Sequence, residues 1–570
     1  MSEYDLVIRG GTVIDGTGSA PIDADIAIKD GKIARVGTVS GTGTEEIDAK
    51  GKLVTPGFVD IHTHYDAQAV WDTHLAPSAQ HGVTTVVMGN CGVGFAPCKP
   101  QDRHRLIELM EGVEDIPGAV MNEGLKWEWE SFPEYLDALD RRPRDVDVCA
   151  LLPHAAVRVY VMGDRAIALE NANQGDIAQM REIARDAMKA GAFGFSTSRT
   201  ISHKTLKGDH TPTMKAQEDE LTGIALGMKD AGTGMMEFVS EWAPDHDAEF
   251  AMLRRITETA GRPTVFTLNQ RHARPEVWRE ILAHADRAAA DGVPIRPVFG
   301  PRATGALLGL SGSQNPFSGT RTYQTIAHLP LAERVAAMRE PAIKAAILNE
   351  DPKEFNTFPL FHRLRSDMMF RFGNPPIYEP KAEDSFAAIA AREGRTPEDV
   401  TYDVMLESDG TDFIYTTISS YAYGDLRMPE QLLANRNCIM GLGDGGAHVA
   451  FILDAGFQTF MLTHWGRDLG KFSPQELIRR VTSDTAEAAG LHDRGILRVG
   501  MKADVNVIDW ARLGAGKPYI AHDLPAGGKR LLQDVYGYDA TIVSGQVTYR
   551  GGVATGALPG KLVRGPQAAA

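Results

Sequence analysis

The chain has 570 residues, more than the roughly 250–300 at which a single hydrophobic core stops growing, so we expect a large domain, a smaller one and long insertions. Hydrophobic residues make up 43% of the chain and charged residues 24%, which is typical of a globular protein. The formal net charge of −16 argues against nucleic acid as a partner, because phosphate binding requires a basic surface. A small anionic substrate stays compatible with this charge, since it needs only local cations.

Signals for a membrane or for export are missing from the sequence. No apolar run approaches the roughly 18–20 residues of a membrane span, and the first residues lack the pattern of a signal peptide. Four cysteines in so long a chain do not make a disulfide framework. We therefore expect a cytoplasmic protein with no membrane partner. A homo-oligomer is compatible with a chain of this size, although no interface pattern stands out.

The two ends of the chain read as short β-strands. Apolar residues alternate in the first fifty residues with Gly-Gly and Asp-Gly at the turns, and residues 500–510 and 539–552 repeat this style. Chain ends of a domain often lie close together. We therefore predict one small β-domain built from residues 1–55 plus 495–570, with a large domain at 56–494 inserted between them.

The middle of the chain alternates short apolar runs with helical patterns. Eight such runs occur, from "GFVDIH" at the start to "CIMGLGD" at the end, which is the number that a closed parallel (β/α)₈ barrel needs. An open doubly wound sheet is the rival, but no Gly-rich dinucleotide fingerprint follows an early strand. Two segments fall outside the repeat, at about 95–146 and 301–435. Both would lie on the C-terminal face of the barrel, where active sites are built.

His62 and His64 end the first predicted barrel strand. Side chains at i and i+2 of a strand point to the same side, so the two imidazoles lie next to each other. Two neutral imidazoles so placed can share one metal ion. The alternative is that the two histidines are ordinary polar residues at the end of a strand. The preceding "KLVTPG" and the acidic Asp66 that follows favour a metal site instead.

Cys91 and Asp444 follow the second and the last predicted strands. Cys91 lies in the Gly-rich turn "GNCGVG", which suits a thiolate ligand better than core packing, whereas Cys98, Cys149 and Cys438 are expected to be packing residues. In a closed barrel the last strand neighbours the first, so Asp444 would face His62 and His64, where a carboxylate can move a proton. Its alternative is to cap the following turn. His448 would orient Asp444 or begin the next helix.

Several segments, taken in order, resemble the amidohydrolase superfamily and in particular its N-acyl-D-amino-acid deacylase (D-aminoacylase) branch. They are "DLVIRGGTVIDGTG", "GKLVTPGFVDIHTHYD", "GVTTVVMGNCGVGFAP", "LLPHAAVR", "GAFGFSTS" and "GILRVGMKADVNVID". The resemblance implies a metal-dependent TIM barrel with a small β-sandwich. It also implies His62, His64, Cys91 and Asp444 as metal ligands and Asp444 as the catalytic acid/base, with one or two Zn²⁺ ions as cofactor.

The sequence departs from this family in the middle strands. A His-His pair is expected where this chain has Asn269 and Gln270, and Glu237 and Glu241 stand where the family shows a Thr-His run. Amides are poor zinc ligands. The site therefore holds a single ion, or another ligand replaces the histidines. The candidates for that replacement are Glu241, His203, His210 and His272.

The resemblance implies a hydrolase that cleaves the amide bond of N-acyl amino acids, with the D-series favoured. The second hypothesis is a hydrolase of a cyclic or other small amide, and the third is a non-catalytic protein of the same fold. The donors expected for an oxyanion are Asn269, Gln270 and His154, and the cations expected for a substrate carboxylate are Arg199, Arg271 and Arg302. Together with His203 and His448, these residues are the predicted substrate contacts.

Overall fold

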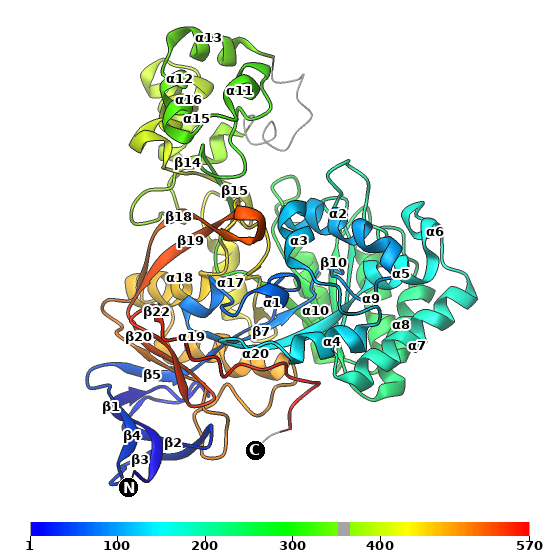
Figure 1. Cartoon of the computed structure of the whole chain (residues 1–570), viewed down its shortest axis with the longest axis vertical. Coiled ribbons are helices and arrows are strands. Elements are labelled where there is room, and N and C mark those ends of the chain that lie inside the picture. Colours follow the sequence, from blue (N-terminus) through cyan, green and yellow to red (C-terminus); the bar gives the residue numbers. More distant parts are fainter. Residues whose placement is uncertain (1, 352–364, 569–570) are drawn as a thin grey trace.

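A computed structural model describes residues 2–351 and 365–568, and its centre is a barrel of parallel strands. Eight strands pair in parallel in the order β16-β12-β11-β10-β9-β8-β7-β6, so neighbours in the sheet follow the chain (Figure 1). The strands are β6 (Phe58–Asp60), β7 (Val83–Met88), β8 (Asp147–Pro153), β9 (Gly194–Arg199), β10 (Met235–Ser240), β11 (Thr264–Thr267), β12 (Ile295–Phe299) and β16 (Ile439–Met440). The prediction of a (β/α)₈ barrel from eight apolar runs is confirmed.

The barrel closes just beyond the ends of its first and last strands. The Asp444 N–H donates to the carbonyl of His62 at 3.1 Å, and the His64 N–H donates to the carbonyl of Gly445 at 2.7 Å. Fully apolar side chains such as Val87 fill the interior below these bonds. The first and last strands therefore present their following residues to the same space.

Helices cover the outside of the barrel because each has one apolar face. In α7 (Gln174–Ala190) the buried residues recur at helical spacing, and the side chain of Asn173 caps the first turn. Pairs of these helices pack side by side, such as α7 and α8. The principal ones are α4 (Phe132–Asp140), α5 (His154–Met162), α8 (Glu218–Ala231), α9 (His246–Ala260), α10 (Val277–Ala290), α17 (Arg427–Ala434), α19 (Pro474–Val481) and α20 (Ser483–Ala488).

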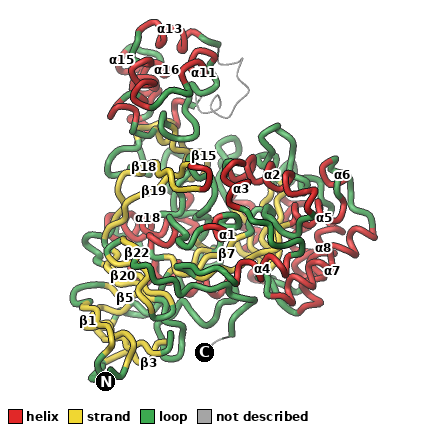
Figure 2. The backbone as a smooth tube through the Cα atoms, viewed as in Figure 1, coloured by secondary structure: helices red, strands yellow, loops and turns green. Residues whose placement is uncertain are grey.

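Both chain ends contribute to one nine-stranded sheet, as the sequence predicts. The join is an antiparallel pair in which Thr55 of β5 lies opposite Asn506 of β17. Figure 2 shows these strands gathered beside the barrel. They are β1 (Tyr4–Val13), β2 (Ile22–Lys29), β3 (Lys32–Gly37), β4 (Gly43–Asp48), β5 (Leu53–Pro56), β17 (Val505–Ile508), β20 (Tyr538–Val543), β21 (Gln546–Arg550) and β22 (Val553–Ala554). The domain limits near residues 55 and 495 stay a prediction.

A long hairpin leaves this sheet and reaches the mouth of the barrel, which the sequence did not predict. Its strands are β18 (Gly514–Leu524) and β19 (Gly528–Tyr536), paired antiparallel. The N–H of Leu531 on β19 donates to the carbonyl of Val449 at 2.6 Å, in the loop after β16. The hairpin therefore couples the terminal β-domain to a loop of the barrel mouth.

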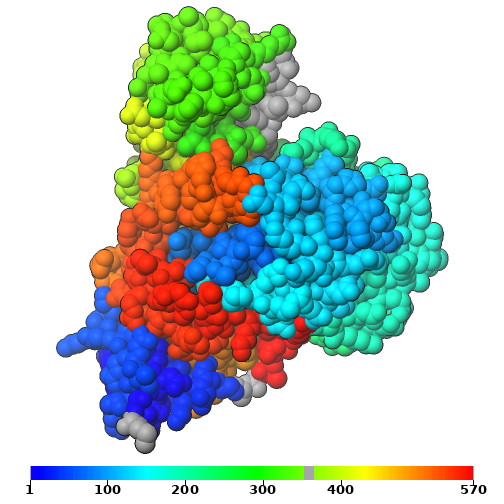
Figure 3. Space-filling model, in the orientation of Figure 1, coloured from blue at the N-terminus to red at the C-terminus, as the bar shows by residue number. Residues whose placement is uncertain are grey.

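The two segments outside the repeat differ in form. The first holds α2 (Arg103–Glu114) and α3 (Gly118–Gly124), which lie over the barrel (Figure 1). The second forms a lobe with its own apolar core, which projects from the body in Figure 3. Its described elements are β13 (Thr304–Leu308), α11 (Arg321–Ile326), α12 (Leu331–Met338), α13 (Pro341–Asn349), β14 (Met369–Arg371), α15 (Phe386–Glu393), α16 (Pro397–Met405) and β15 (Ile414–Ser419). Among the described residues, no helix combines the length and apolarity of a membrane span.

Candidate metal centre and active-site cavity

Four predicted site residues meet at the mouth of the barrel. The Nε2 atom of His62 lies 3.5 Å from the Cys91 Sγ atom and 3.5 Å from an Asp444 carboxylate oxygen. The Nε2 atom of His64 lies 3.7 Å from that same oxygen. The two histidines and Cys91 offer ligand atoms that all lie within 4.8 Å of one another.

These separations fit a shared metal ion. Ligand atoms about 2.0–2.3 Å from a tetrahedral Zn²⁺ lie about 3.4–3.6 Å from each other. The His62–Cys91 and His62–Asp444 separations of 3.5 Å agree with this, and the His64–Asp444 separation of 3.7 Å is slightly longer. Imidazole, thiolate and carboxylate are also the donor types that zinc prefers.

An excess of buried acid around the histidines gives a second, independent test of the fit. Burial raises the pKa of Glu237 to about 8 and the pKa values of Glu114 and Asp60 to about 7. It also raises the pKa of Asp66 to about 6. The charged groups that oppose these shifts are histidines, chiefly His64. Buried carboxyls in such number require a cation or protons to balance them.

The ligand-type residues carry pKa shifts of both signs. Burial lowers the pKa of His64, but the carboxylates of Glu114 and Asp444 outweigh it and raise the value to about 9. Burial alone would raise the pKa of Asp444, yet the hydrogen bond from His64 and the charges of neighbouring histidines bring it to about 2. Burial and the surrounding carboxylates raise the pKa of the Cys91 thiol. A metal ion would reverse this last shift, because only the thiolate ligates.

Three of the predicted site residues at the cavity adopt left-handed backbone conformations although they are not glycines. The φ angles are +55° at Cys91, +48° at Asp444 and +46° at His448. Such conformations cost free energy and are retained where the surrounding structure enforces them, which is common at functional sites. The sharp turns aim the Cys91 and Asp444 side chains back toward the strand ends.

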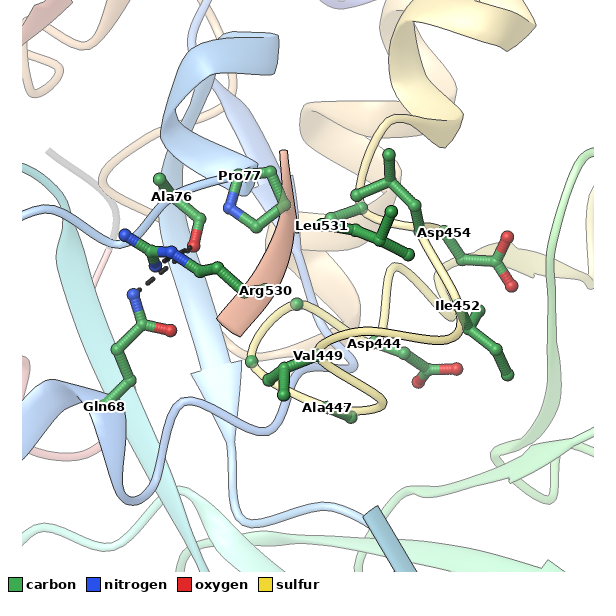
Figure 4. A pocket seen from close by; sticks show the side chains of 14 residues that line it. Gln68, Ala76, Pro77, Asp444, Ala447, Val449, Ile452, Asp454, Arg530 and Leu531 are labelled. Atoms are coloured by element: carbon green, nitrogen blue, oxygen red, sulfur yellow. Dashed lines mark hydrogen bonds between the residues drawn. The ribbon is translucent and has the colours of Figure 1, made fainter. Parts of the chain in front are cut away.

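The loop that carries Asp444 is held from behind by the hairpin. Figure 4 shows Arg530 of β19 bonded to the carbonyl of Ala76, which Gln68 also contacts, so the guanidinium does not reach for Asp444. Arg530 also pairs with Asp523 at 2.8 Å. The loop is therefore fixed by backbone and apolar contacts, and Asp444 stays available to the histidines.

A cavity of about 610 Å³ opens over the cluster. Besides His62, His64, Cys91 and Asp444, its walls include five residues that the sequence analysis singled out: His203, Asn269, Arg271, His272 and His448. The His203 Nδ1 atom lies 2.7 Å from the hydroxyl of Ser198, which orients the ring. The other wall residues include both polar and apolar side chains, among them Thr200, Trp242, Thr304, Arg365, Met368 and Ile418.

Four predicted substrate contacts are not part of the wall of this cavity: His154, Gln270, Arg302 and Arg199. His154 is fully buried, with one ring nitrogen 2.8 Å from Glu220 and the other 2.8 Å from Thr197. The amide of Gln270 is buried and bonds backbone atoms of Pro275 and Ala422. Arg302 is buried, with a hydrogen bond to Leu453 and an ion pair to Asp454. Each of these three side chains therefore has partners inside the protein, away from the cavity wall.

The remaining candidates fall in different places. Arg199 is half-buried, lies 3.5 Å from Glu249 and is not part of the cavity wall. Glu241 binds Thr200 and Arg271 instead of the histidines, so it does not fill the vacant ligand position. His210 is not part of the cavity wall either. His272 is, and neither of its buried ring nitrogens has a hydrogen-bond partner among the described residues.

Two buried carboxylates in the site were not predicted as site residues. Glu114 ends α2 and Glu237 lies in β10, and each is 2% exposed. For Glu237 a signal existed, since an acidic residue inside an apolar strand is rarely buried without a partner. For Glu114 the sequence held no such signal, because α2 is an amphipathic helix in an insertion.

Comparison with known proteins places the chain in a family. A sequence profile described as "Amidohydrolase family" matches residues 45–418 and 429–549. The chain belongs to the amidohydrolase family. An uncharacterised Mycobacterium tuberculosis protein is 30% identical, covering 96% of this chain and 92% of its own length. A D-aminoacylase of Alcaligenes xylosoxydans xylosoxydans is 26% identical, covering 89% and 88%.

A solved amidohydrolase-type structure supports the fold. N-acyl-D-glutamate deacylase from Bordetella bronchiseptica, solved with zinc and a phosphonate inhibitor, superposes with a TM-score of 0.65 at 22% identity. It covers 98% of this chain and 99% of the other. The predicted fold and the resemblance to the D-aminoacylase branch are both confirmed, and the protein is an amidohydrolase.

Proposed function

We propose that this amidohydrolase is a zinc-dependent enzyme that cleaves the amide bond of N-acyl amino acids, with the D-series favoured. The observation that carries the proposal is the convergence of His62, His64, Cys91 and Asp444 at one point of a cavity large enough for a small substrate. The D-aminoacylase of Alcaligenes, similar over 89% of this chain, supports the substrate class.

The four residues would hold one cation through the Nε2 atoms of both histidines, the Cys91 thiolate and an Asp444 oxygen. A divalent cation there supplies a Lewis acid for the amide carbonyl and acidifies a water molecule. Asp444 faces the cavity and would accept the proton of the attacking water and pass it to the departing nitrogen. His203 and Asn269 line the same cavity and would donate hydrogen bonds to the substrate.

The free carboxylate of an N-acyl amino acid requires a cation in the wall. Of the three arginines expected for this task, Arg271 alone lines the cavity, and its guanidinium pairs with Glu241. Arg365 adds a second guanidinium to the wall, paired with Asp367. We assign the carboxylate contact to these two residues, because both line the cavity whereas Arg199 and Arg302 do not.

Metal analysis and a substrate panel test the proposal together. Protein purified without chelator is expected to contain about one equivalent of zinc and to hydrolyse N-acetyl-D-amino acids faster than their L-enantiomers. Faster hydrolysis of hydantoins or cyclic imides would replace the substrate class with that of cyclic amides. Less than about half an equivalent of metal, with none taken up from added zinc, would favour a non-catalytic protein and end the proposal.

A further inference from the structure

The two histidines of the candidate metal centre share an arrangement on their second nitrogen. The Nδ1 atom of His64 lies 3.4 Å from a carboxylate oxygen of Glu114, and the Nδ1 atom of His62 lies 3.9 Å from one of Glu237. All four side chains are buried, with exposed fractions of 1–3%. Each imidazole therefore has the other ligand-type residues on its Nε2 side and a carboxylate on its Nδ1 side.

Both buried carboxylates destabilise the fold unless the two imidazoles compensate them. Glu114 is the last residue of α2, where the partial negative charge of the helix end disfavours an anion. Glu237 lies in β10 inside the barrel, near apolar neighbours such as Met235. Moving a carboxylate from water into the protein interior costs on the order of several kcal/mol, and a nearby partner must offset this desolvation penalty. A histidine N–H is the compensation that the structure offers to each.

Unsatisfied atoms mark the same contacts. Among the described residues, His64 Nδ1, Glu114 Oε1 and Glu237 Oε1 are buried without any hydrogen-bond partner. The other oxygen of Glu237 accepts the Cys91 N–H at 3.1 Å. The oxygens without partners are therefore the carboxylate oxygens that lie nearest the histidine Nδ1 atoms.

The placement of Glu237 also decides between two roles for it. A carboxylate that replaced a missing ligand of the shared ion would stand on the Nε2 side of His62, with Cys91 and Asp444. The measured contact is to Nδ1, on the opposite edge of the ring. Glu237 therefore lies behind its histidine and not beside the ion.

We propose that Glu114 and Glu237 are positioning residues that hold His64 and His62 by their Nδ1–H groups, so that both Nε2 atoms face the metal ion. The inference rests on the proposed metal site and deepens it. A carboxylate bonded to the far nitrogen fixes the tautomer and the ring orientation and strengthens the imidazole as a ligand. Loss of such a partner typically costs about 10–100-fold in metal affinity.

Paired substitutions of each glutamate test the proposal through zinc affinity, measured by competition with a chelator. E114L and E237L are expected to weaken binding about 10–100-fold. E114Q and E237Q should retain most of the affinity, because the amide oxygen still accepts the imidazole N–H. E220Q, which changes a buried glutamate bonded to His154, is the matched control and should bind zinc as the wild type does.

The outcomes separate this inference from the metal site itself. Wild-type protein that binds no zinc ends the proposed function, whereas zinc-binding wild type with unaffected leucine variants ends only the positioning role. If the glutamine variants bound zinc as weakly as the leucine variants, the carboxylates would be metal ligands and not positioning groups. Should the leucine variants fail to fold, ¹⁵N-histidine spectra of the zinc-loaded wild type decide the question. Protons on Nδ1 of both rings are expected, and a proton on either Nε2 would overturn the proposal.

Discussion

Asp444 contacts His62 twice, by its backbone and by its side chain. Its N–H donates to the His62 carbonyl at 3.1 Å, and its carboxylate lies 3.5 Å from the Nε2 atom of the same residue. The bond that closes the barrel therefore also sets the distance between the candidate acid/base and the first histidine. Closure of the barrel and the geometry of the candidate site therefore depend on the same two residues, Asp444 and His62.

The first prediction concerns Asp444 as the proton carrier. Asp444→Asn preserves the shape but removes the group that accepts and returns the proton, so kcat should fall by about 10²–10⁴. Steady-state kinetics with an N-acetyl-D-amino acid measure this, and metal analysis of the same sample should show the ion largely retained. Unchanged turnover would remove Asp444 from the mechanism.

The second prediction separates Cys91 from the other cysteines. Cys91→Ala is expected to weaken zinc binding by at least about 100-fold, more than the loss of an outer contact costs. Cys149→Ala makes the same chemical change within the apolar interior of the barrel and serves as the control. It should lower stability by about 1 kcal/mol and leave zinc affinity unchanged. Equal zinc affinities of the two variants would contradict a ligand role for Cys91.

A third prediction addresses the buried ion pairs of Asp147. Asp147 of β8 lies 2.6 Å from Arg494 and 3.1 Å from Lys502, and its carboxylate is 3% exposed. Burial raises its pKa, but these two cations outweigh it and lower the value. Asp147→Asn should lower the free energy of unfolding by about 3–5 kcal/mol, because the buried guanidinium of Arg494 loses its fully buried carboxylate partner.

Denaturant unfolding measures this loss, and a second acid at the same arginine provides the comparison. Asp493 also pairs with Arg494 but is 24% exposed at its side chain. Asp493→Asn should cost less than about 1 kcal/mol, as exposed pairs do. If both variants lost the same free energy, burial would not be the reason for the stability of the pair.

The fourth prediction is a pH dependence of stability from His81. This histidine is fully buried and bonded to Thr459, and burial, aided by the charge of Arg302, lowers its pKa to about 3. Its pKa in the unfolded chain is about 6.5, so only the unfolded state takes up a proton between these values. The contribution is fully present above pH 6.5 and is lost as the pH falls toward 3, with a slope of up to about 1.4 kcal/mol per unit.

The comparison of the wild type with His81→Asn isolates this contribution. Asparagine can still bond Thr459 but does not titrate, so the variant should lose less free energy of unfolding between pH 7.5 and pH 5.5. Other histidines titrate equally in both proteins and cancel in the difference. If the free energy of unfolding fell equally with pH in both proteins, His81 would not be responsible for the loss of stability at acidic pH.

The sequence was sufficient to predict the barrel and the residues that meet at its mouth. Eight apolar runs mark the eight barrel strands, and the i, i+2 spacing of His62 and His64, which follow β6, predicted that both rings lie on one side. Cys91 and Asp444 were predictable because each directly follows a strand, and the ends of parallel strands meet at one edge. These are local signals, so the sequence reports them directly.

The tertiary structure alone decided what surrounds these residues. Glu114 reaches His64 from a helix fifty residues further along the chain, and no local pattern encodes that contact. The sequence also predicted three site residues whose side chains have partners inside the protein: His154, Gln270 and Arg302. Burial and partnership depend on elements distant in sequence, because they arise only when the strands, the insertions and the hairpin pack together.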